Sequence, residues 1–185
     1  MKLLVLGAGG TGGYYGGRLA EAGVDVRFLV RPARAENLAR NGLVIRSPVG
    51  DVRMKVQTLT TADSPVDAVL LSCKAYDLDS AMDAIAPAVG PATLVLPMLN
   101  GLRHFDALDK RFGRERVLGG LCHIGATLDA DGGIRHLNRQ HRLTLGPRIP
   151  AQTGAARALN EVLKQGRFEL RYSDNILQEI WEKFS

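Results

Sequence analysis

The stretch Lys2-Leu-Leu-Val-Leu-Gly-Ala-Gly-Gly-Thr-Gly12 decides the fold of this chain of 185 residues. A short apolar run over residues 2–6 ends at Gly7, which is typical of a buried β-strand. The glycines that follow match G-x-G-x-x-G, and residues 11–22 have the pattern of a helix that stops at Gly23. A glycine motif between a strand and a helix predicts the phosphate-binding turn of a dinucleotide-binding βαβ unit.

The glycines of this turn have separate expected roles. Gly7 permits the tight turn, Gly9 lets the backbone approach a pyrophosphate, and Gly12 lets the helix pack closely on the strand. The unpaired N–H groups at the start of the helix favour phosphate binding. We therefore expect the cofactor to bind along the whole turn, which consists of Gly7, Ala8, Gly9, Gly10, Thr11 and Gly12. The alternative is a glycine-rich turn without a ligand.

The end of the second expected strand, residues 25–30, bears on which dinucleotide binds. An NAD-binding domain usually has an acidic residue there, which binds the ribose 2′-hydroxyl. This chain has Arg31 instead, followed by Pro32 and then Arg34. A guanidinium binds a 2′-phosphate with two hydrogen bonds, whereas a carboxylate would repel it. Arg31 therefore predicts NADP as the cofactor, and a solvated surface arginine is the alternative.

Strands and helices alternate along most of the chain. This order predicts an α/β fold of the Rossmann type, a doubly wound parallel sheet with crossover helices. Residues 43–58 alternate in polarity around a Pro-Val-Gly-Asp turn, which predicts a two-stranded hairpin. Residues 117–145 read as antiparallel strands added to the parallel sheet. Further strands are expected at residues 68–72, 93–96 and 168–172, and further helices at 33–40, 78–89, 105–112, 153–165 and from 175 onward.

Two polar residues follow expected strands directly. Lys74 comes after the strand at 68–72, and Asn100 comes shortly after the strand at 93–96. Ligands bind at the carboxyl ends of strands in open α/β sheets, so both residues are site candidates. From position alone, each could equally be an ordinary loop residue.

Composition narrows the classes of function. The chain has a net charge of +5, and its arginines are scattered without clustered aromatics. Such a charge fits an anionic cofactor, and we expect no nucleic-acid partner. No apolar run is long enough to span a membrane. The N-terminus lacks the pattern of a signal peptide, so the expected location is the cytoplasm. No histidine has partners at metal-ligand spacing, and we expect no metal.

Six blocks together resemble the ketopantoate reductase family (2-dehydropantoate 2-reductases) over nearly the whole chain. They are KLLVLGAGGTGGYYGGRLAEAG, FLVRP, LLSCKAYDLDSAMDAI, LPMLNGL, GGLCHIGATLDADGGIRH with LTLGP, and NILQEIWEKFS. The glycine motif is shared with many Rossmann proteins. Lys-Ala after one strand, Asn-Gly after the next and Trp-x-Lys near the end are much more specific in combination.

The resemblance implies roles for particular residues. The glycine turn would hold the pyrophosphate of NADP and Arg31 its 2′-phosphate, with Lys74 and Asn100 beside the nicotinamide and the substrate. The backbone at Gly125 would lie near the cofactor, and Lys183 matches the catalytic lysine of the family. The implied reaction is the NADPH-dependent reduction of 2-dehydropantoate to pantoate, on the route to pantothenate and coenzyme A.

The resemblance implies a helical C-terminal domain in the family, and we expect this chain to stop before it. We expect residues 1–173 to form the NADP-binding domain and residues 174–185 to begin the helix that leads into the missing domain. The last turn contains Trp181 and Phe184 and has no glycine or proline terminator, which favours a helix that once continued. A homodimer would form mainly through the missing domain.

Alternatives stay open at the chemical centre. Glu179 lies four residues before Lys183, so these two residues could form a plain surface ion pair. The substrate could be a 2-oxo acid other than 2-dehydropantoate. The chain could also be a module that binds NADP without catalysis, or a structural domain without a ligand.

Overall fold

A parallel sheet of five strands forms the centre of the computed structural model, which describes residues 1–185. The strands lie in the order β5-β2-β1-β6-β7, and every pair in this sheet is parallel. Their bounds are β1 (Lys2–Leu6), β2 (Asp25–Leu29), β5 (Gln57–Leu59), β6 (Ala68–Leu71) and β7 (Leu94–Pro97). Along the chain, β1, β2 and β5 form one side of this sheet, and β6 and β7 then form the other side. The topological switch point, where ligands bind in such sheets, therefore lies between β1 and β6.

Six helices accompany the sheets. They are α1 (Gly10–Glu21), α2 (Pro32–Asn41), α3 (Leu78–Ile85), α4 (His104–Phe112), α5 (Thr153–Leu163) and α6 (Ile176–Phe184). The sequence predicts all six to within a few residues. The helix expected at 78–89 is shorter than predicted, because a 3₁₀ turn with Pro87 in it follows Ile85. Proline lacks the N–H that would continue the α-helical bonding.

The remaining strands form a second sheet, and here two expectations are wrong in detail. Its strands are β3 (Leu43–Arg46), β4 (Val52–Met54), β8 (Gly119–Leu128), β9 (Ile134–Gly146) and β10 (Glu169–Tyr172). The antiparallel pair β8–β9 is present as predicted, but it belongs to this sheet and not to the parallel one. The hairpin expected at 43–58 ends at Met54, because residues 57–59 pair with β2 in the first sheet.

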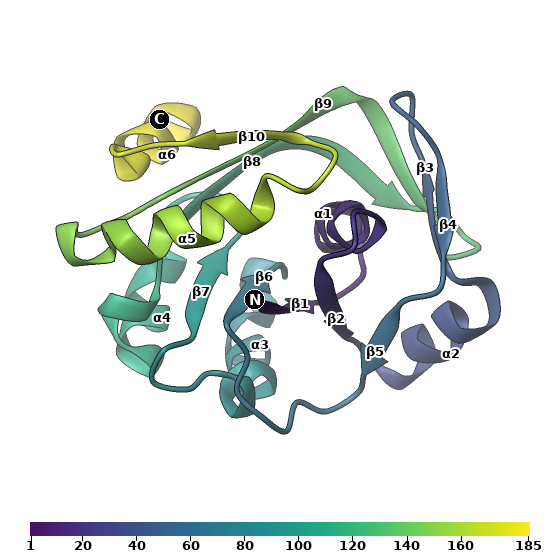
Figure 1. The fold of residues 1–185 in the computed structure, drawn as a ribbon, viewed down its shortest axis with the longest axis horizontal. Helices are drawn as coiled ribbons and strands as arrows, with labels where there is room; N and C mark the ends of the chain where they lie inside the picture. Colours follow the sequence, from purple (N-terminus) through teal and green to yellow (C-terminus); the bar gives the residue numbers. More distant parts are fainter.

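The two sheets enclose two hydrophobic clusters. One cluster lies between the sheets, where α1 and α5 are packed, and Figure 1 shows these helices in that layer. The other covers the opposite face of the parallel sheet and contains side chains of α3, α4 and α6. Both faces of the parallel sheet are thus buried, as the near-continuous apolar runs of its strands require. At its carboxyl edge, Lys74 and Asn100 are exposed.

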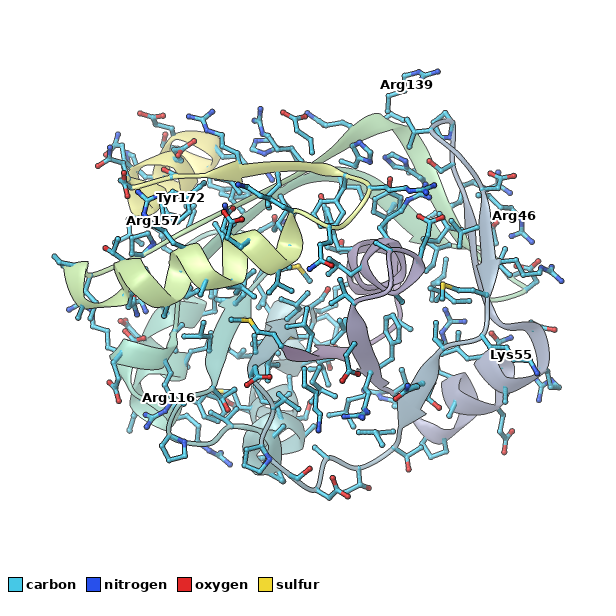
Figure 2. All side chains as sticks on the ribbon, in the orientation of Figure 1. Arg46, Lys55, Arg116, Arg139, Arg157 and Tyr172 are labelled. Atoms are coloured by element: carbon cyan, nitrogen blue, oxygen red, sulfur yellow. The ribbon has the colours of Figure 1, made fainter.

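Strand β10 is the edge strand of the second sheet, and helix α5 packs beside it and β9. The Arg157 guanidinium of α5 lies 4.5 Å from the centre of the Tyr172 ring of β10, and Figure 2 labels this pair. In α6, Ile176 and Ile180 are buried in the second cluster, whereas Trp181 is mostly exposed. None of the helices has the length and apolar character needed to cross a membrane.

Candidate cofactor and substrate site

The glycine turn has the geometry that a phosphate-binding turn requires. Gly7 has a φ of +82°, a conformation that favours glycine, and it directly follows β1. A Cβ added at Gly9 would meet no atom within 4 Å, so open space lies in front of this residue. No side chain caps the start of α1, and its first turn contains no acidic residue. These features leave backbone N–H groups free at the positive end of the helix.

The other glycines of the turn are required by close packing. A Cβ at Gly12 would lie 3.1 Å from the carbonyl oxygen of Gly7, in agreement with its expected role in helix–strand packing. Gly10 has a different neighbour, because its Cβ would lie 2.6 Å from the backbone oxygen of Ala126 in β8. Gly10 therefore lets the second sheet approach the start of α1, a contact that the sequence motif does not reveal.

Arg31 and Arg34 differ sharply in their surroundings. Arg31 precedes α2 at the carboxyl end of β2, is exposed, and its guanidinium has no hydrogen bond or ion pair. Arg34, by contrast, donates hydrogen bonds to three oxygens, those of Ala8, Gly132 and Asn37, at 2.7–2.8 Å. Partial burial also lowers the Arg34 pKa. Only Arg31 is free to bind an added phosphate.

Lys74 and Asn100 lie at the ends of neighbouring strands. Lys74 follows β6 and precedes a 3₁₀ turn over residues 75–77, and Asn100 follows β7 next to Gly101, whose φ is +79°. Both side chains are exposed and neither has a hydrogen-bond partner in the chain. Because β6 pairs with β7, the two residues lie along the same carboxyl edge as the glycine turn and Arg31.

Lys183 lies in the last turn of α6 and reaches the second sheet. Its Nζ donates a 2.6 Å hydrogen bond to the carbonyl oxygen of Cys122 in β8. Partial desolvation lowers the pKa of the Lys183 ammonium. The ion pair with Glu179 that the sequence allowed is absent, because Glu179 binds Arg171 of β10 at 3.2 Å. Lys183 therefore has no acidic partner.

Strand β8 brings Lys183 toward the edge of the parallel sheet. Val117, just before β8, bridges Val95 of β7 in parallel. Cys122 and Asn100 lie equally far beyond that bridge along their two chains, since each is five residues downstream. Cys122, whose carbonyl oxygen binds Lys183, is therefore at the same number of residues from the β7 bridge as Asn100 is. The structure thus places the glycine turn, Arg31, Lys74 and Asn100 at the carboxyl edge of the parallel sheet and holds Lys183 against β8.

Gly125 and His123 are further features of β8. The register of β8 against β9 shifts between Ile124 and Ala126, so Gly125 lies in a β-bulge, and Ala126 contacts the glycine turn. His123 was not singled out by the sequence; its buried Nδ1 has no hydrogen-bond partner. Burial, with the nearby Lys183 charge, lowers the His123 pKa. The sequence feature that could have indicated His123 as a site residue is its position two residues before Gly125 in the CHIGA segment.

The residues at this edge fit a phosphorylated dinucleotide. The free space at Gly9, the uncapped start of α1 and the unpaired Arg31 guanidinium would suit a pyrophosphate and a further phosphate. No group of three or more His, Cys, Asp or Glu side chains is arranged to hold a metal ion. A Rossmann-type domain with a glycine turn at its switch point defines the class, that of the dinucleotide-binding domains.

The chain belongs to the ketopantoate reductase family PanE/ApbA, whose family model matches residues 3–149. It is 41% identical to the uncharacterized oxidoreductase YkpB of Bacillus subtilis over 185 residues. Its structure is similar to that of 2-dehydropantoate 2-reductase from Geobacter metallireducens, with a TM-score of 0.91, 32% identity and coverage of 99% of this chain and 61% of that one.

A structural neighbour with another substrate is also similar. The ternary structure of D-mandelate dehydrogenase with NADH and anilino(oxo)acetate has a TM-score of 0.89 and 25% identity, covering 99% of this chain and 60% of that one. The chain spans 61% of the length of YkpB and all 185 of its own residues take part in that match. The matched region is therefore the N-terminal part of the family's proteins, with the glycine turn and the edge described above.

Proposed function

We propose that this chain is the cofactor-binding part of an NADPH-dependent reductase that converts 2-dehydropantoate to pantoate. The observation that carries the cofactor assignment is the unpaired guanidinium of Arg31 at the carboxyl end of β2, next to the glycine turn. A cation in this position would attract the 2′-phosphate that distinguishes NADP from NAD. Family membership and the similar 2-dehydropantoate 2-reductase structure support the choice of substrate.

The chemistry assigned to the chain is binding and proton transfer. Bound NADPH would supply a hydride to the carbonyl carbon of the substrate. Lys183 would donate a proton to the carbonyl oxygen, and its lowered pKa favours proton release nearer to neutral pH. Lys74 would attract the substrate carboxylate, and Asn100 would orient the substrate through hydrogen bonds. The backbone at Gly125 would contact the cofactor from β8.

The second candidate is reduction of another 2-oxo acid. It is favoured by the similarity to a D-mandelate dehydrogenase structure and by the uncharacterized status of YkpB. The unpaired cations at the sheet edge would attract the carboxylate of any 2-oxo acid. They would not distinguish one 2-oxo acid from another by the rest of its structure. A panel of 2-oxo acids, assayed with NADPH and with a protein that includes the downstream sequence of the relatives, separates the two candidates.

Parallel titrations with NADPH and NADH, followed by nicotinamide fluorescence, test the cofactor assignment. We expect NADPH to bind more tightly, and Arg31→Ala to weaken NADPH binding by about 10- to 100-fold, the usual worth of charge-assisted hydrogen bonds. NADH binding should change little. Equal affinities for both cofactors, unchanged by Arg31→Ala, would contradict the assignment. Tight NADPH binding without turnover of any 2-oxo acid, even with the downstream sequence present, would favour a non-catalytic NADP-binding module.

A further inference from the structure

Arg34 connects three segments that lie far apart in the sequence. Its Nη2 donates a 2.7 Å hydrogen bond to the carbonyl oxygen of Ala8 in the glycine turn. Its Nη1 donates 2.8 Å hydrogen bonds to Gly132 O, in the turn between β8 and β9, and to Asn37 Oδ1 in α2. Asn37 in turn donates a 3.1 Å hydrogen bond to the carbonyl oxygen of Asp131. The guanidinium thus ties the glycine turn to the β8–β9 turn.

The hydrogen bond from Arg34 to the Ala8 carbonyl fixes the orientation of the peptide group that joins Ala8 to Gly9. A trans peptide is planar, so its C=O and N–H point in opposite directions, and the chain contains no cis peptide. With the Ala8 carbonyl held toward Arg34, the Gly9 N–H points to the opposite side. If this peptide rotated, its carbonyl oxygen would take the place of the N–H and would repel a phosphate. Open space remains around Gly9, and no other side chain holds this peptide.

We infer that Arg34 is a positioning residue for the cofactor, which orients the Gly9 N–H for the pyrophosphate by holding the Ala8 carbonyl. This inference rests on the proposed function, because it assumes that the glycine turn binds a dinucleotide. It assigns the two arginines different tasks. Arg31 contacts the 2′-phosphate, whereas Arg34 acts through the backbone and touches no part of the cofactor. Orienting a donor in advance increases affinity, because binding then requires no further ordering.

The β8–β9 turn takes part in this arrangement. Gly132 has a φ of +88°, and a Cβ there would lie 2.5 Å from Asn37 Oδ1 and 2.8 Å from Arg34 Nη1. A glycine at this position therefore lets the turn accept the Arg34 hydrogen bond. Arg46 holds the same turn from β3 by ion pairs with Asp129 and Asp131 at 2.9 and 2.7 Å, and Figure 2 labels this arginine. Arg46 makes no hydrogen bond to the glycine turn and offers a matched control.

Three variants and three ligands test the inference. The variants are Arg34→Met, Arg31→Met and Arg46→Met, and the ligands are NADPH, NADH and adenosine 2′-monophosphate, which lacks the pyrophosphate. We expect Arg34→Met to weaken NADPH and NADH by the same factor, about tenfold, and to leave adenosine 2′-monophosphate within about twofold. Arg31→Met should weaken NADPH and adenosine 2′-monophosphate and spare NADH. Arg46→Met should leave all three affinities unchanged.

Two results would overturn the inference while leaving the proposed function in place. In the first, Arg34→Met binds NADPH as tightly as the unsubstituted protein does. In the second, Arg34→Met weakens adenosine 2′-monophosphate as much as NADPH, which means that Arg34 serves the adenosine side or that α2 has lost its local structure. An unsubstituted protein that binds neither dinucleotide would refute the proposed function, and the inference with it.

Discussion

The carboxyl edge of the parallel sheet and the second sheet differ in how many of their positive charges form ion pairs. At the edge, Arg31, Lys74 and Lys183 have no acidic partner. In the second sheet, four of the six arginines, Arg46, Arg135, Arg142 and Arg171, form ion pairs with Asp or Glu side chains, and Arg53 and Arg139 do not. Paired arginines contribute to the structure, whereas unpaired cations at a ligand-binding edge are available for anions. The net charge of +5 therefore says less about ligands than the location of the unpaired charges.

The largest effect is expected from the unpaired cation proposed as the proton donor. In a protein that reduces a 2-oxo acid, Lys183→Met should lower kcat by about a hundredfold or more, as loss of a general acid does. A general acid works only while protonated, so activity should fall as the pH rises through the Lys183 pKa. Burial lowers that pKa, so the fall should occur at a lower pH than for an ordinary lysine.

A kcat–pH profile of Lys183→Met and Lys183→Arg checks this assignment. Arginine stays charged but does not give up its proton, so Lys183→Arg should be slow and should lack the decline at high pH. A decline that persists unchanged in both variants would show that another group titrates.

The next effect contrasts a paired arginine with an unpaired one. Arg148 is almost fully buried and binds both carboxylate oxygens of Asp109 at 2.7 Å. Arg148→Met would leave Asp109 without its partner, and we expect the free energy of unfolding to fall by about 3 kcal/mol. Arg31→Met should change it by less than about 0.5 kcal/mol. Urea unfolding of both variants measures the difference, and equal losses would contradict the contrast between the two regions.

The neighbouring residues Gly9 and Gly10 should also differ in whether substitution affects stability or cofactor binding, with a smaller effect on the free energy of unfolding. Gly10→Ala places a methyl group 2.6 Å from the Ala126 oxygen, so β8 must shift, and we expect a loss of about 2 kcal/mol. Gly9→Ala meets no atom and should leave stability nearly unchanged, yet it should weaken NADPH binding because the methyl group occupies the space for the phosphates. Thermal unfolding and NADPH titration, performed on both variants, test the pair. A stable Gly10→Ala variant would mean that β8 is not held against α1.

The smallest effect concerns the exposed ion pair on α6. Glu179→Gln removes the negative charge of the ion pair with Arg171, which is more than half exposed, so the free energy of unfolding should fall by less than about 1 kcal/mol. The pH dependence of activity should be unchanged, because Glu179 binds Arg171 and not Lys183. A shift of that profile would indicate that Glu179 reaches Lys183 in solution.

The parallel sheet and the position of its carboxyl edge could be predicted from the sequence because their signals are local. The apolar run before Gly7 and the glycine motif identify β1 and its turn, and Lys74 and Asn100 follow strands that are recognisable as buried runs. Arg31 is equally local, since it follows the second predicted strand directly.

The local pairs β3–β4 and β8–β9 could be predicted, but their assembly into one second sheet could not, because β9 pairs with β3 and β10, which are distant in the chain. Alternation of polarity indicates that residues 43–46 and 134–146 are strands, but it does not indicate that β3 pairs with β9. The same holds for single side chains. Nothing near Arg34 in the sequence indicates that its acceptors are Ala8 and Gly132, and the contact of Lys183 with Cys122 depends on how α6 packs on β8.

Strand β8 contacts both Lys183, the proposed proton donor, and the glycine turn, the proposed phosphate site. Cys122 accepts the hydrogen bond of Lys183, and Ala126 contacts Gly10 in the turn for the cofactor phosphates. The bulge at Gly125 lies between these contacts. One residue inserted or removed here would change the separation of the two contacts by about 3.4 Å. That displacement exceeds the length of a hydrogen bond, so the length of this one strand sets the separation of Lys183 from the glycine turn.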